Sequence, residues 1–177
     1  MPHFILTGTP GAGKTSIIEA LSARGRVVVR EAATDIITER QAKGEDRPWL
    51  AADFIDEIVA VQRNRRLTTR GGPQFHDRSV ICTLALCRHL GREPPHALTA
   101  EIDALKRSGT FASVALFIDN LGFVEPTPVR RISFAEALTF EAMHKAAYAE
   151  HGFQIHQIDR GALNDRVGQV IEFTRSA

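Results

Sequence analysis

The sequence predicts an α/β fold of three layers, in which helices cover both faces of a five-stranded parallel sheet. Three observations predict it. Strand-like apolar runs alternate with helical patterns along all 177 residues, an order typical of parallel sheets. The first apolar run passes directly into a glycine-rich loop and then into a helical pattern. Polar residues follow several of the runs, where the carboxyl edge of such a sheet would lie.

The five strands are predicted from runs of apolar and β-branched residues. The first is FIL at 4–6, the second is RVVVR at 26–30, and SVALFI at 113–118 is the clearest of the others. The runs at 74–77 and 153–158 complete the set. Because helical segments separate the strands, we expect parallel pairing with right-handed crossovers.

The helices are predicted from apolar residues that recur every three or four positions and from signals at the helix ends. Gly25 and Gly109 each follow a helical pattern, and Ser133 with Glu136 forms a capping box. The predicted helices cover 16–23, 32–42, 52–66, 97–108, 133–150 and 164–174, and a further apolar helix ends at Leu90. Helices between all the strands predict a sheet that is covered on both sides.

Length and composition limit the class of protein. A chain of 177 residues with 44% hydrophobic and 24% charged residues is expected to form one globular domain, 1–177. A net charge of +1 gives no support for a nucleic-acid partner. Cys82 and Cys87 fall on different faces of one predicted helix, so we expect no disulfide. The sequence has no apolar run of membrane-spanning length and no signal peptide before the first strand, so we expect a cytoplasmic protein.

The glycine-rich loop carries the main functional signal. GTPGAGKT, at 8–15, matches the Walker A spacing G-x-x-x-x-G-K-[ST] between a strand and a helix. Glycines let the backbone curl so that its N–H groups and the helix N-terminus face phosphate oxygens. The predicted nucleotide-binding residues are Gly8, Thr9, Pro10, Gly11, Ala12, Gly13, Lys14, Thr15 and Ser16. Lys14 would reach the β- and γ-phosphates and the Thr15 hydroxyl would bind Mg²⁺. The sequence therefore predicts a site for ATP or GTP, and the absence of an Asn-Lys-x-Asp guanine signature favours ATP.

Charged residues at the ends of two predicted strands are candidates for catalysis. Asp77 could hold Mg²⁺ as a Walker B aspartate does, and Arg78 could reach a phosphate or an acceptor. The alternative is an aspartate that caps the next helix, beside a solvated arginine. Glu31 ends the second strand and could act as general base towards an acceptor hydroxyl. The alternative for Glu31 is an acid that complements the dipole of the following helix.

The end of the helix at 52–66 is a candidate wall for an acceptor pocket. Gln62 could form paired hydrogen bonds with an amide or a base edge, and Arg63 lies beside it. The alternative is an ordinary exposed helix end. His76 alternates to the strand face opposite Asp77, so we expect it to be packed rather than catalytic.

The longest irregular segment, 119–132, is a candidate lid. It contains two prolines and the pair Arg130–Arg131, and loops of this length in compact domains are usually functional or disordered. The two arginines could close over the triphosphate and neutralise charge in the transition state. The alternative is an exposed basic loop.

These motifs together resemble a known family. The Walker loop, REAA at 30–33, FHDRS at 75–79 and the segment 130–155 are similar to a family of small P-loop domains labelled AAA, which is grouped with the ribosylnicotinamide kinase domain of NadR. The resemblance implies a nucleoside- or nucleotide-kinase fold with strand order 2-3-1-4-5. It also implies that Glu31 and the Asp77-Arg78-Ser79 motif stand where deoxynucleoside kinases carry a Glu and an acidic-Arg-Ser motif. Gln62 resembles the glutamine with which those kinases read a base.

Two functions are compatible with this pattern. The first is a kinase-like phosphotransferase that moves the γ-phosphoryl of ATP or GTP, with Mg²⁺, to a small nucleoside- or nucleotide-like acceptor. The second is a nucleotide-dependent binding switch or slow ATPase with a protein or lipid partner. A kinase requires an acceptor cavity lined by Glu31 and Gln62, whereas a switch requires a loop that orders with triphosphate and an exposed apolar patch.

Overall fold

The structure is a computed structural model that describes residues 2–123, 127 and 131–176. The strands are β1 (His3–Thr7), β2 (Val27–Val29), β3 (Gln74–Asp77), β4 (Phe111–Ile118) and β5 (Gln154–Ile158). The helices are α1 (Lys14–Ala23), α2 (Ala32–Ala42), α3 (Phe54–Thr68), α4 (Val80–His89), α5 (His96–Ser108), α6 (Phe134–Glu150) and α7 (Leu163–Ser176), with a 3-10 helix η1 (Pro48–Leu50). The strand pairs are parallel in the order β2-β3-β1-β4-β5, which confirms the predicted fold.

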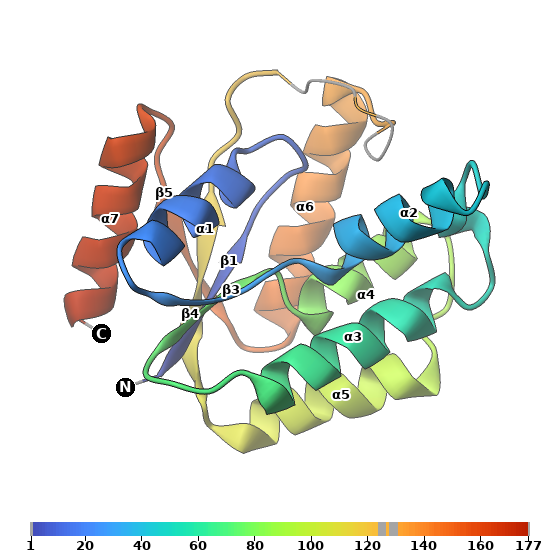
Figure 1. The fold of residues 1–177 in the computed structure, drawn as a ribbon, viewed down its shortest axis with the longest axis horizontal. Helices are drawn as coiled ribbons and strands as arrows, with labels where there is room; N and C mark the ends of the chain where they lie inside the picture. Colours follow the sequence, from blue (N-terminus) through green and yellow to red (C-terminus); the bar gives the residue numbers. More distant parts are fainter. Residues whose placement is uncertain (1, 124–126, 128–130, 177) are drawn as a thin grey trace.

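Two hydrophobic clusters pack on opposite faces of the sheet, as the alternation of side chains along a strand requires. In β1, Ile5 joins the cluster formed with α2 to α6, whereas Phe4 and Leu6 join the cluster formed with α1 and α7. Figure 1 shows α1 and α7 on one side of the sheet and the other helices on the opposite side. The predicted three layers are therefore present, and the central strand β1 leads into the phosphate loop between them.

Element ends differ from the sequence prediction by a few residues, for physical reasons. α1 begins at Lys14 rather than at Ser16, so the lysine itself lies in the first helical turn. β2 contains only Val27–Val29 because it is an edge strand that pairs with β3 alone. α3 begins at Phe54 rather than at residue 52, because the chain first forms the 3-10 helix η1, which begins at Pro48. β4 begins earlier than predicted because Phe111 pairs with His3 of β1.

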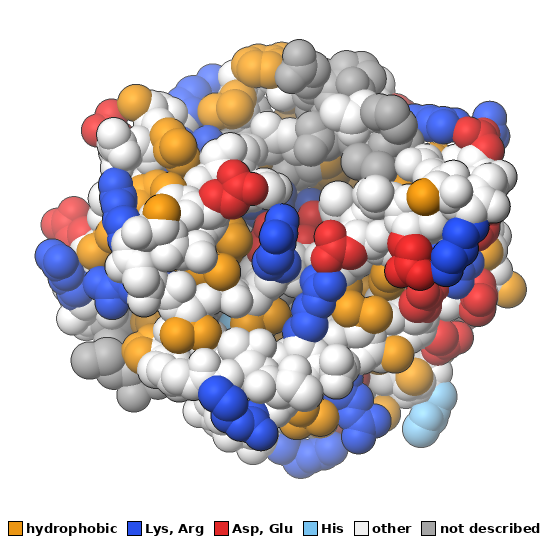
Figure 2. All heavy atoms as spheres, in the orientation of Figure 1, with side chains coloured by type: hydrophobic (Ala, Val, Ile, Leu, Met, Phe, Trp, Pro, Cys, Tyr) orange, Lys and Arg blue, Asp and Glu red, His pale blue; other side chains and the backbone are white. Residues whose placement is uncertain are grey.

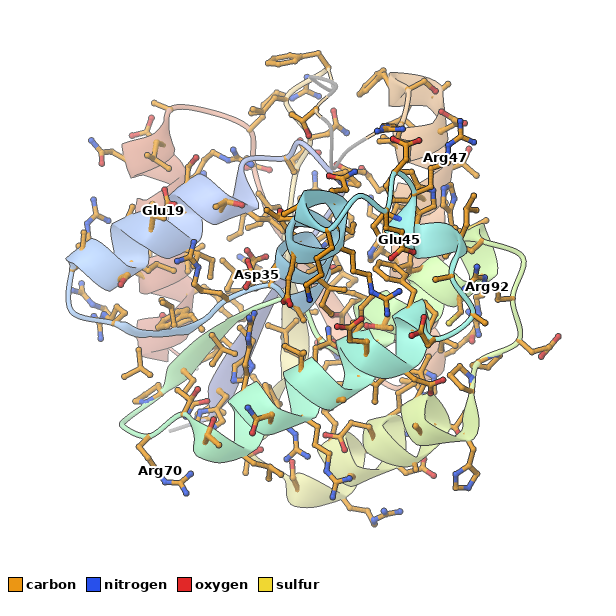
Figure 3. The ribbon with its side chains drawn as sticks, turned by 45° about the vertical axis from the view of Figure 1, so that its right-hand side comes forward. Glu19, Asp35, Glu45, Arg47, Arg70 and Arg92 are labelled. Atoms are coloured by element: carbon orange, nitrogen blue, oxygen red, sulfur yellow. The ribbon has the colours of Figure 1, made fainter. Side chains whose placement is uncertain are left out.

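Arginine side chains fix α2, α3 and the loop before them. Arg65 of α3 donates to the carbonyl oxygens of Arg30 and Glu31, and its guanidinium lies 2.6 Å from the carboxylate of Asp35 on α2. Asp35 is labelled in Figure 3. Arg92, also labelled there, donates to the carbonyl oxygens of Leu50 and Ala51. The end of α3 is therefore a structural brace that holds the backbone of Glu31 in place.

The described surface has mixed charge. On the face drawn in Figure 2, blue and red side chains are interspersed, and the exposed hydrophobic atoms form separate groups. The large exposed hydrophobic residues come from separate segments: Leu50, Leu67, Phe123, Leu138 and Leu163. None of the helices described here combines the length and the hydropathy that a membrane crossing requires.

Candidate active site

The phosphate loop connects β1 to α1 at the carboxyl edge of the sheet (Figure 1). Gly8 has a φ of 134°, and a Cβ atom there would lie 2.5 Å from the carbonyl oxygen of Ile118. Gly13, which is the N-cap of α1, adopts the left-handed conformation with a φ of 78°. Left-handed residues at such a turn direct successive backbone N–H groups into one concavity. The loop therefore has the backbone geometry of an anion site, and only glycine fits at position 8.

Lys14 lies folded onto this loop. Its ammonium group donates to the carbonyl oxygens of Gly8 and Thr9 at 3.1 and 2.8 Å, and the residue is 6% exposed. Burial, together with the nearby positive charge of Arg78, lowers the pKa of Lys14 to about 7. A lysine in this state has a strong electrostatic preference for a negatively charged neighbour. Thr15 and Ser16, which follow it in α1, are exposed.

Glu31 and Arg78 form an ion pair across the carboxyl ends of two strands. The Nε atom of Arg78 lies 2.6 Å from Oε1 of Glu31, and Oε2 of the same carboxylate accepts a hydrogen bond from Thr34. Burial alone would raise the pKa of Glu31, but the Arg78 guanidinium, with help from Lys14, holds that pKa below its usual range. Glu31 occupies the N-cap position of α2 without capping it. The glutamate therefore stays ionised and acts in a charged cluster rather than as a helix cap.

Arg78 is held in place by its backbone as well. Its φ of 72° is the one positive value among the described non-glycine residues, and its N–H donates to the carbonyl oxygen of Leu6. Such a conformation costs about 1–3 kcal/mol and persists where the surroundings enforce it. Its Nη1 also donates to Nε2 of His144 at 3.0 Å. The guanidinium is thus fixed from two sides, and the alternative of a solvated arginine is wrong.

Asp77 ends β3 directly beside β1, in register with Leu6. It is 6% exposed, and its Oδ1 atom has no hydrogen-bond partner within the described residues. Burial, reinforced by the negative charge of Glu31, raises the pKa of Asp77 to about 6. The hydroxyl of Ser79, not Asp77, caps α4 by accepting from the Ile81 N–H. The alternative of a helix-capping aspartate is therefore wrong, and a buried carboxylate oxygen is left for another ligand.

A cavity of about 520 Å³ is lined by the phosphate loop and by polar and apolar side chains of other elements. Its lining includes Pro10, Gly11 and Gly13 to Ser16 of the phosphate loop, and the polar side chains of Glu31, Gln62 and Arg78. Much of the remaining lining is apolar or aromatic: Ile37, Trp49, Phe54, Ile58, Leu86, His89, Leu90 and Phe140. A space of this size suits a small organic ligand. A separate cavity of about 30 Å³, lined in part by Asp77, shares Gln62 and Arg78 with it.

The two polar residues predicted on α3 have different environments. Gln62 lines the large cavity, and its side-chain oxygen accepts a hydrogen bond from the hydroxyl of Thr83 at 3.0 Å. The Gln62 amide nitrogen donates to no acceptor in the described part of the chain, so it is available to a ligand. Arg63 faces outward with 65% side-chain exposure and lies 3.9 Å from Glu101. Gln62 therefore lines the cavity and its contact with an acceptor stays a prediction, whereas Arg63 is absent from the residues that line the cavity.

The candidate lid contains one described arginine. Arg130 lies outside the described residues. Arg131 lines the large cavity, pairs with Asp46 at 2.6 Å and lies over the ring of Trp49. Arg131 therefore lies at the cavity and forms an ion pair with a carboxylate from the loop before η1.

Sequence reasoning assigned no role to His144. The residue is 0% exposed on α6, its Nδ1 lies 2.8 Å from the carbonyl oxygen of Phe140, and its Nε2 receives the Arg78 hydrogen bond. A histidine within a mixed helical segment gives no sequence signal of this contact. His76 is buried, and its ring packs against His3 and Phe111, as the alternation of β3 predicts. Cys82 and Cys87 are both buried free thiols.

The comparisons with known proteins agree with this fold. A family model described as an AAA domain matches residues 3–166. Deoxyadenosine kinase from M. mycoides with bound dCTP has a similar structure, with a TM-score of 0.67 and 13% identity over 100% of both chains. The same kinase with dCMP and a flexible dCDP gives 0.65 and 11% identity over 98% of each chain. Shikimate kinase from Acinetobacter baumannii in complex with shikimate gives 0.57 and 16% identity, over 99% of this chain and 94% of the other. At these identities the likeness shows a shared fold. No curated protein sequence matches the chain.

Proposed function

The chain belongs to the AAA domain family whose model matches residues 3–166, and on this premise we propose that it is a kinase-like phosphotransferase. It would transfer the γ-phosphoryl of ATP, or of GTP, to a small nucleoside- or nucleotide-like acceptor. The observation that carries the proposal is that one cavity is lined both by the phosphate loop and by Glu31, Gln62 and Arg78. Phosphoryl transfer requires a donor site and an acceptor site that share one cavity in this way.

The residues of the phosphate loop would bind the donor. Backbone N–H groups would hold the phosphate oxygens, and Lys14 would exchange its two carbonyl contacts for the more negative β- and γ-phosphates. Thr15 is an exposed hydroxyl beside Lys14, and Asp77 offers a buried carboxylate oxygen without a protein donor. Both groups supply oxygen ligands of the kind that Mg²⁺ takes, directly or through its water. The metal, when bound, neutralises charge on the transferred phosphoryl group.

The charged cluster would position the acceptor. Glu31 is kept ionised by Arg78, so it can accept a hydrogen bond from an acceptor hydroxyl and orient that oxygen towards the γ-phosphate. The Gln62 amide and the aromatic wall suit a flat ligand that carries a polar edge. The two kinases with a similar fold act on different acceptor classes, according to their names. The acceptor class proposed here therefore rests on these side chains.

A thermal-shift screen followed by a transfer assay tests the proposal. Nucleosides, nucleotides and pyridine ribosides are screened with and without a non-hydrolysable ATP analogue, and each hit is assayed with radiolabelled ATP and Mg²⁺. We expect a hit that needs the analogue and becomes phosphorylated, because binding to the native state raises its stability. The test variant is Glu31→Gln, which should abolish transfer. Its matched control is Glu39→Gln, which changes an exposed acid on the helix that follows Glu31 and should leave transfer unchanged. ATP hydrolysis without any acceptor would instead support the binding switch. A switch would also need an exposed apolar patch, whereas the large exposed hydrophobic residues that the structure describes lie on separate segments.

A further inference from the structure

Arg166 is a buried cation beneath the phosphate loop, and it has no role in the phosphoryl transfer proposed above. It lies on α7 and is 3% exposed. Its Nη2 atom donates to the carbonyl oxygen of Ala12 at 2.6 Å and to the carbonyl oxygen of Asp119 at 2.9 Å. One guanidinium group therefore connects the C-terminal helix, the phosphate loop and the end of β4.

Arg166 forms no ion pair with any carboxylate among the described residues. The Asp119 carboxylate raises the pKa of Arg166 through space, but burial lowers that pKa more, and the same carboxylate lies 3.6 Å from Nε of Arg160. The Nε atom of Arg166 is buried without a partner among the described residues. Burying a cation without an ion-pair partner is costly, so this arrangement lowers the stability of the unliganded protein. An anion in the loop would add negative charge close to this guanidinium.

The contact of Arg166 with the Ala12 carbonyl also determines the direction of the Gly13 N–H group. The peptide bond between Ala12 and Gly13 is trans, so its C=O and N–H groups point in opposite directions. Because the carbonyl points to Arg166, the Gly13 N–H points to the other side of the peptide. Within the described residues this N–H donates to no protein acceptor. It is therefore available to a ligand.

The missing side chain of Gly13 makes this contact possible. A Cβ atom at that position would lie 2.9 Å from Nη1 of Arg166. The glycine thus serves two purposes, since it also adopts a left-handed φ of 78°. Arg166 and Gly13 fit together as a unit, with the guanidinium behind the loop and the free amide in front of it.

We propose that Arg166 is a positioning residue for nucleotide phosphates, which orients the Gly13 amide and places a buried positive charge behind the loop. The inference rests on the proposed function, because it needs a phosphate ligand in the loop. It assigns to α7 a part of the donor site that the Walker motif does not contain. A side chain that acts through charge discriminates among ligands by the number of phosphates they carry.

The test compares ligands of graded charge on variants that differ in charge and reach. Dissociation constants for ATP, ADP, adenosine and inorganic tripolyphosphate are measured by calorimetry for the parent protein, Arg166→Met, Arg166→Lys and Arg175→Met. Arg175 is the matched control, because it is an exposed arginine on the same helix. For Arg166→Met we expect the ATP and tripolyphosphate constants to rise on the order of tenfold. ADP should lose less and adenosine should lose nothing, and Arg166→Lys should lie between the parent protein and Arg166→Met.

Three outcomes decide the inference. An equal loss for adenosine and tripolyphosphate, or unchanged constants in a folded Arg166→Met protein, would reduce Arg166 to a structural residue. If the Met variant does not fold, the comparison of Arg166→Lys with the parent protein decides, since losing the two-carbonyl contact should still weaken tripolyphosphate more than adenosine. If the parent protein binds neither ATP nor tripolyphosphate, the proposed function itself fails, and that result is distinct from a failure of Arg166 alone.

Discussion

His144 accepts a hydrogen bond from Arg78 at 3.0 Å, and this contact joins α6 to the charged end of β3. Because Arg78 can only donate, Nε2 of His144 must be the acceptor, and Nδ1 carries the proton that is donated to Phe140. Burial and the positive charge of Arg78 lower the pKa of His144 to about 3, in agreement with this neutral tautomer. The arginine that pairs with Glu31 is therefore positioned by a neutral histidine 66 residues further along the chain.

Removing this acceptor should destabilise the protein. His144→Leu leaves the buried Nη1 donor of Arg78 unsatisfied, and we expect a loss of about 1–3 kcal/mol in the free energy of unfolding. His144→Gln can keep an acceptor oxygen and should recover part of that loss. Urea denaturation measures both, with His96→Leu as a control at an exposed histidine on α5. If Leu and Gln are equally stable, the hydrogen bond does not hold Arg78.

Stability should fall as the pH falls below the ordinary titration range of histidine. The pKa values of His144 and His76 are both lowered to about 3 by burial. Between about pH 6.5 and pH 3 the unfolded chain binds these protons and the folded protein does not, so stability rises with pH across that window. The slope is roughly 1.4 kcal/mol per pH unit for each histidine. Urea denaturation as a function of pH should show a shallower slope for His144→Gln, and an unchanged slope would contradict the assignment.

Lys14→Met should abolish triphosphate binding without unfolding the protein. The lysine contacts only loop carbonyls, and burial with the charge of Arg78 lowers its pKa to about 7. Between pH 7 and 10.5 the unfolded chain binds the proton and the folded protein does not, so the parent protein gains stability as the pH rises. At pH 7 and below, removing this buried charge should leave stability equal or higher.

Calorimetry with ATP measures the binding, and Lys43→Met serves as the control because that lysine is exposed on the surface. A phosphate ligand should raise the pKa of Lys14, so binding near pH 8 should be accompanied by proton uptake. Measurements in two buffers of different ionisation enthalpy detect the uptake. Tight ATP binding by Lys14→Met would overturn the assignment of the donor site.

Asp77→Asn separates metal-assisted chemistry from nucleotide binding. The amide keeps the size of the side chain but cannot ionise. In the parent protein, burial and the negative charge of Glu31 raise the pKa of the Asp77 carboxyl to about 6. We expect the turnover number and its dependence on Mg²⁺ to fall far more than ATP affinity, because a metal acts mainly on charge that develops in the transition state. A steady-state assay across Mg²⁺ concentrations measures this. Equal turnover for both proteins would mean that Asp77 only fills the core beside β1.

The sequence was sufficient for the sheet and for the phosphate loop because both depend on local patterns. Apolar runs separated by helical segments predict parallel strands, and the spacing from Gly8 to Thr15 identifies the loop. The contacts of Arg78 could not be predicted in the same way. Its left-handed backbone and its bond to His144 depend on how β3 and α6 pack. Arg166 was missed for the same reason, since its partners Ala12 and Asp119 are far away in the chain.

The segment 119–132 provides the last prediction, because one of its arginines is described at the cavity. Arg131 pairs with Asp46 at 2.6 Å, and its positive charge also lies over the Trp49 ring. This pair is exposed, and exposed ion pairs contribute little to stability. A triphosphate, which offers more negative charge in a partly enclosed cavity, could therefore take Arg131 away from Asp46.

Three variants test whether the arginine moves to the nucleotide. Arg131→Ala should lower phosphoryl transfer by about 2–4 kcal/mol of transition-state stabilisation, with a smaller loss in ATP affinity, by analogy with the removal of a preorganised donor. Arg130→Ala tests the neighbouring residue, which lies outside the described part of the structure. Asp46→Ala is the matched control: it frees Arg131 from its present partner and should leave transfer unchanged or raise it. Hydrogen exchange across 119–132 should slow when Mg-ATP saturates the parent protein. If protection does not change, or if Asp46→Ala is as damaging as Arg131→Ala, the ion pair is structural and the segment does not act as a lid.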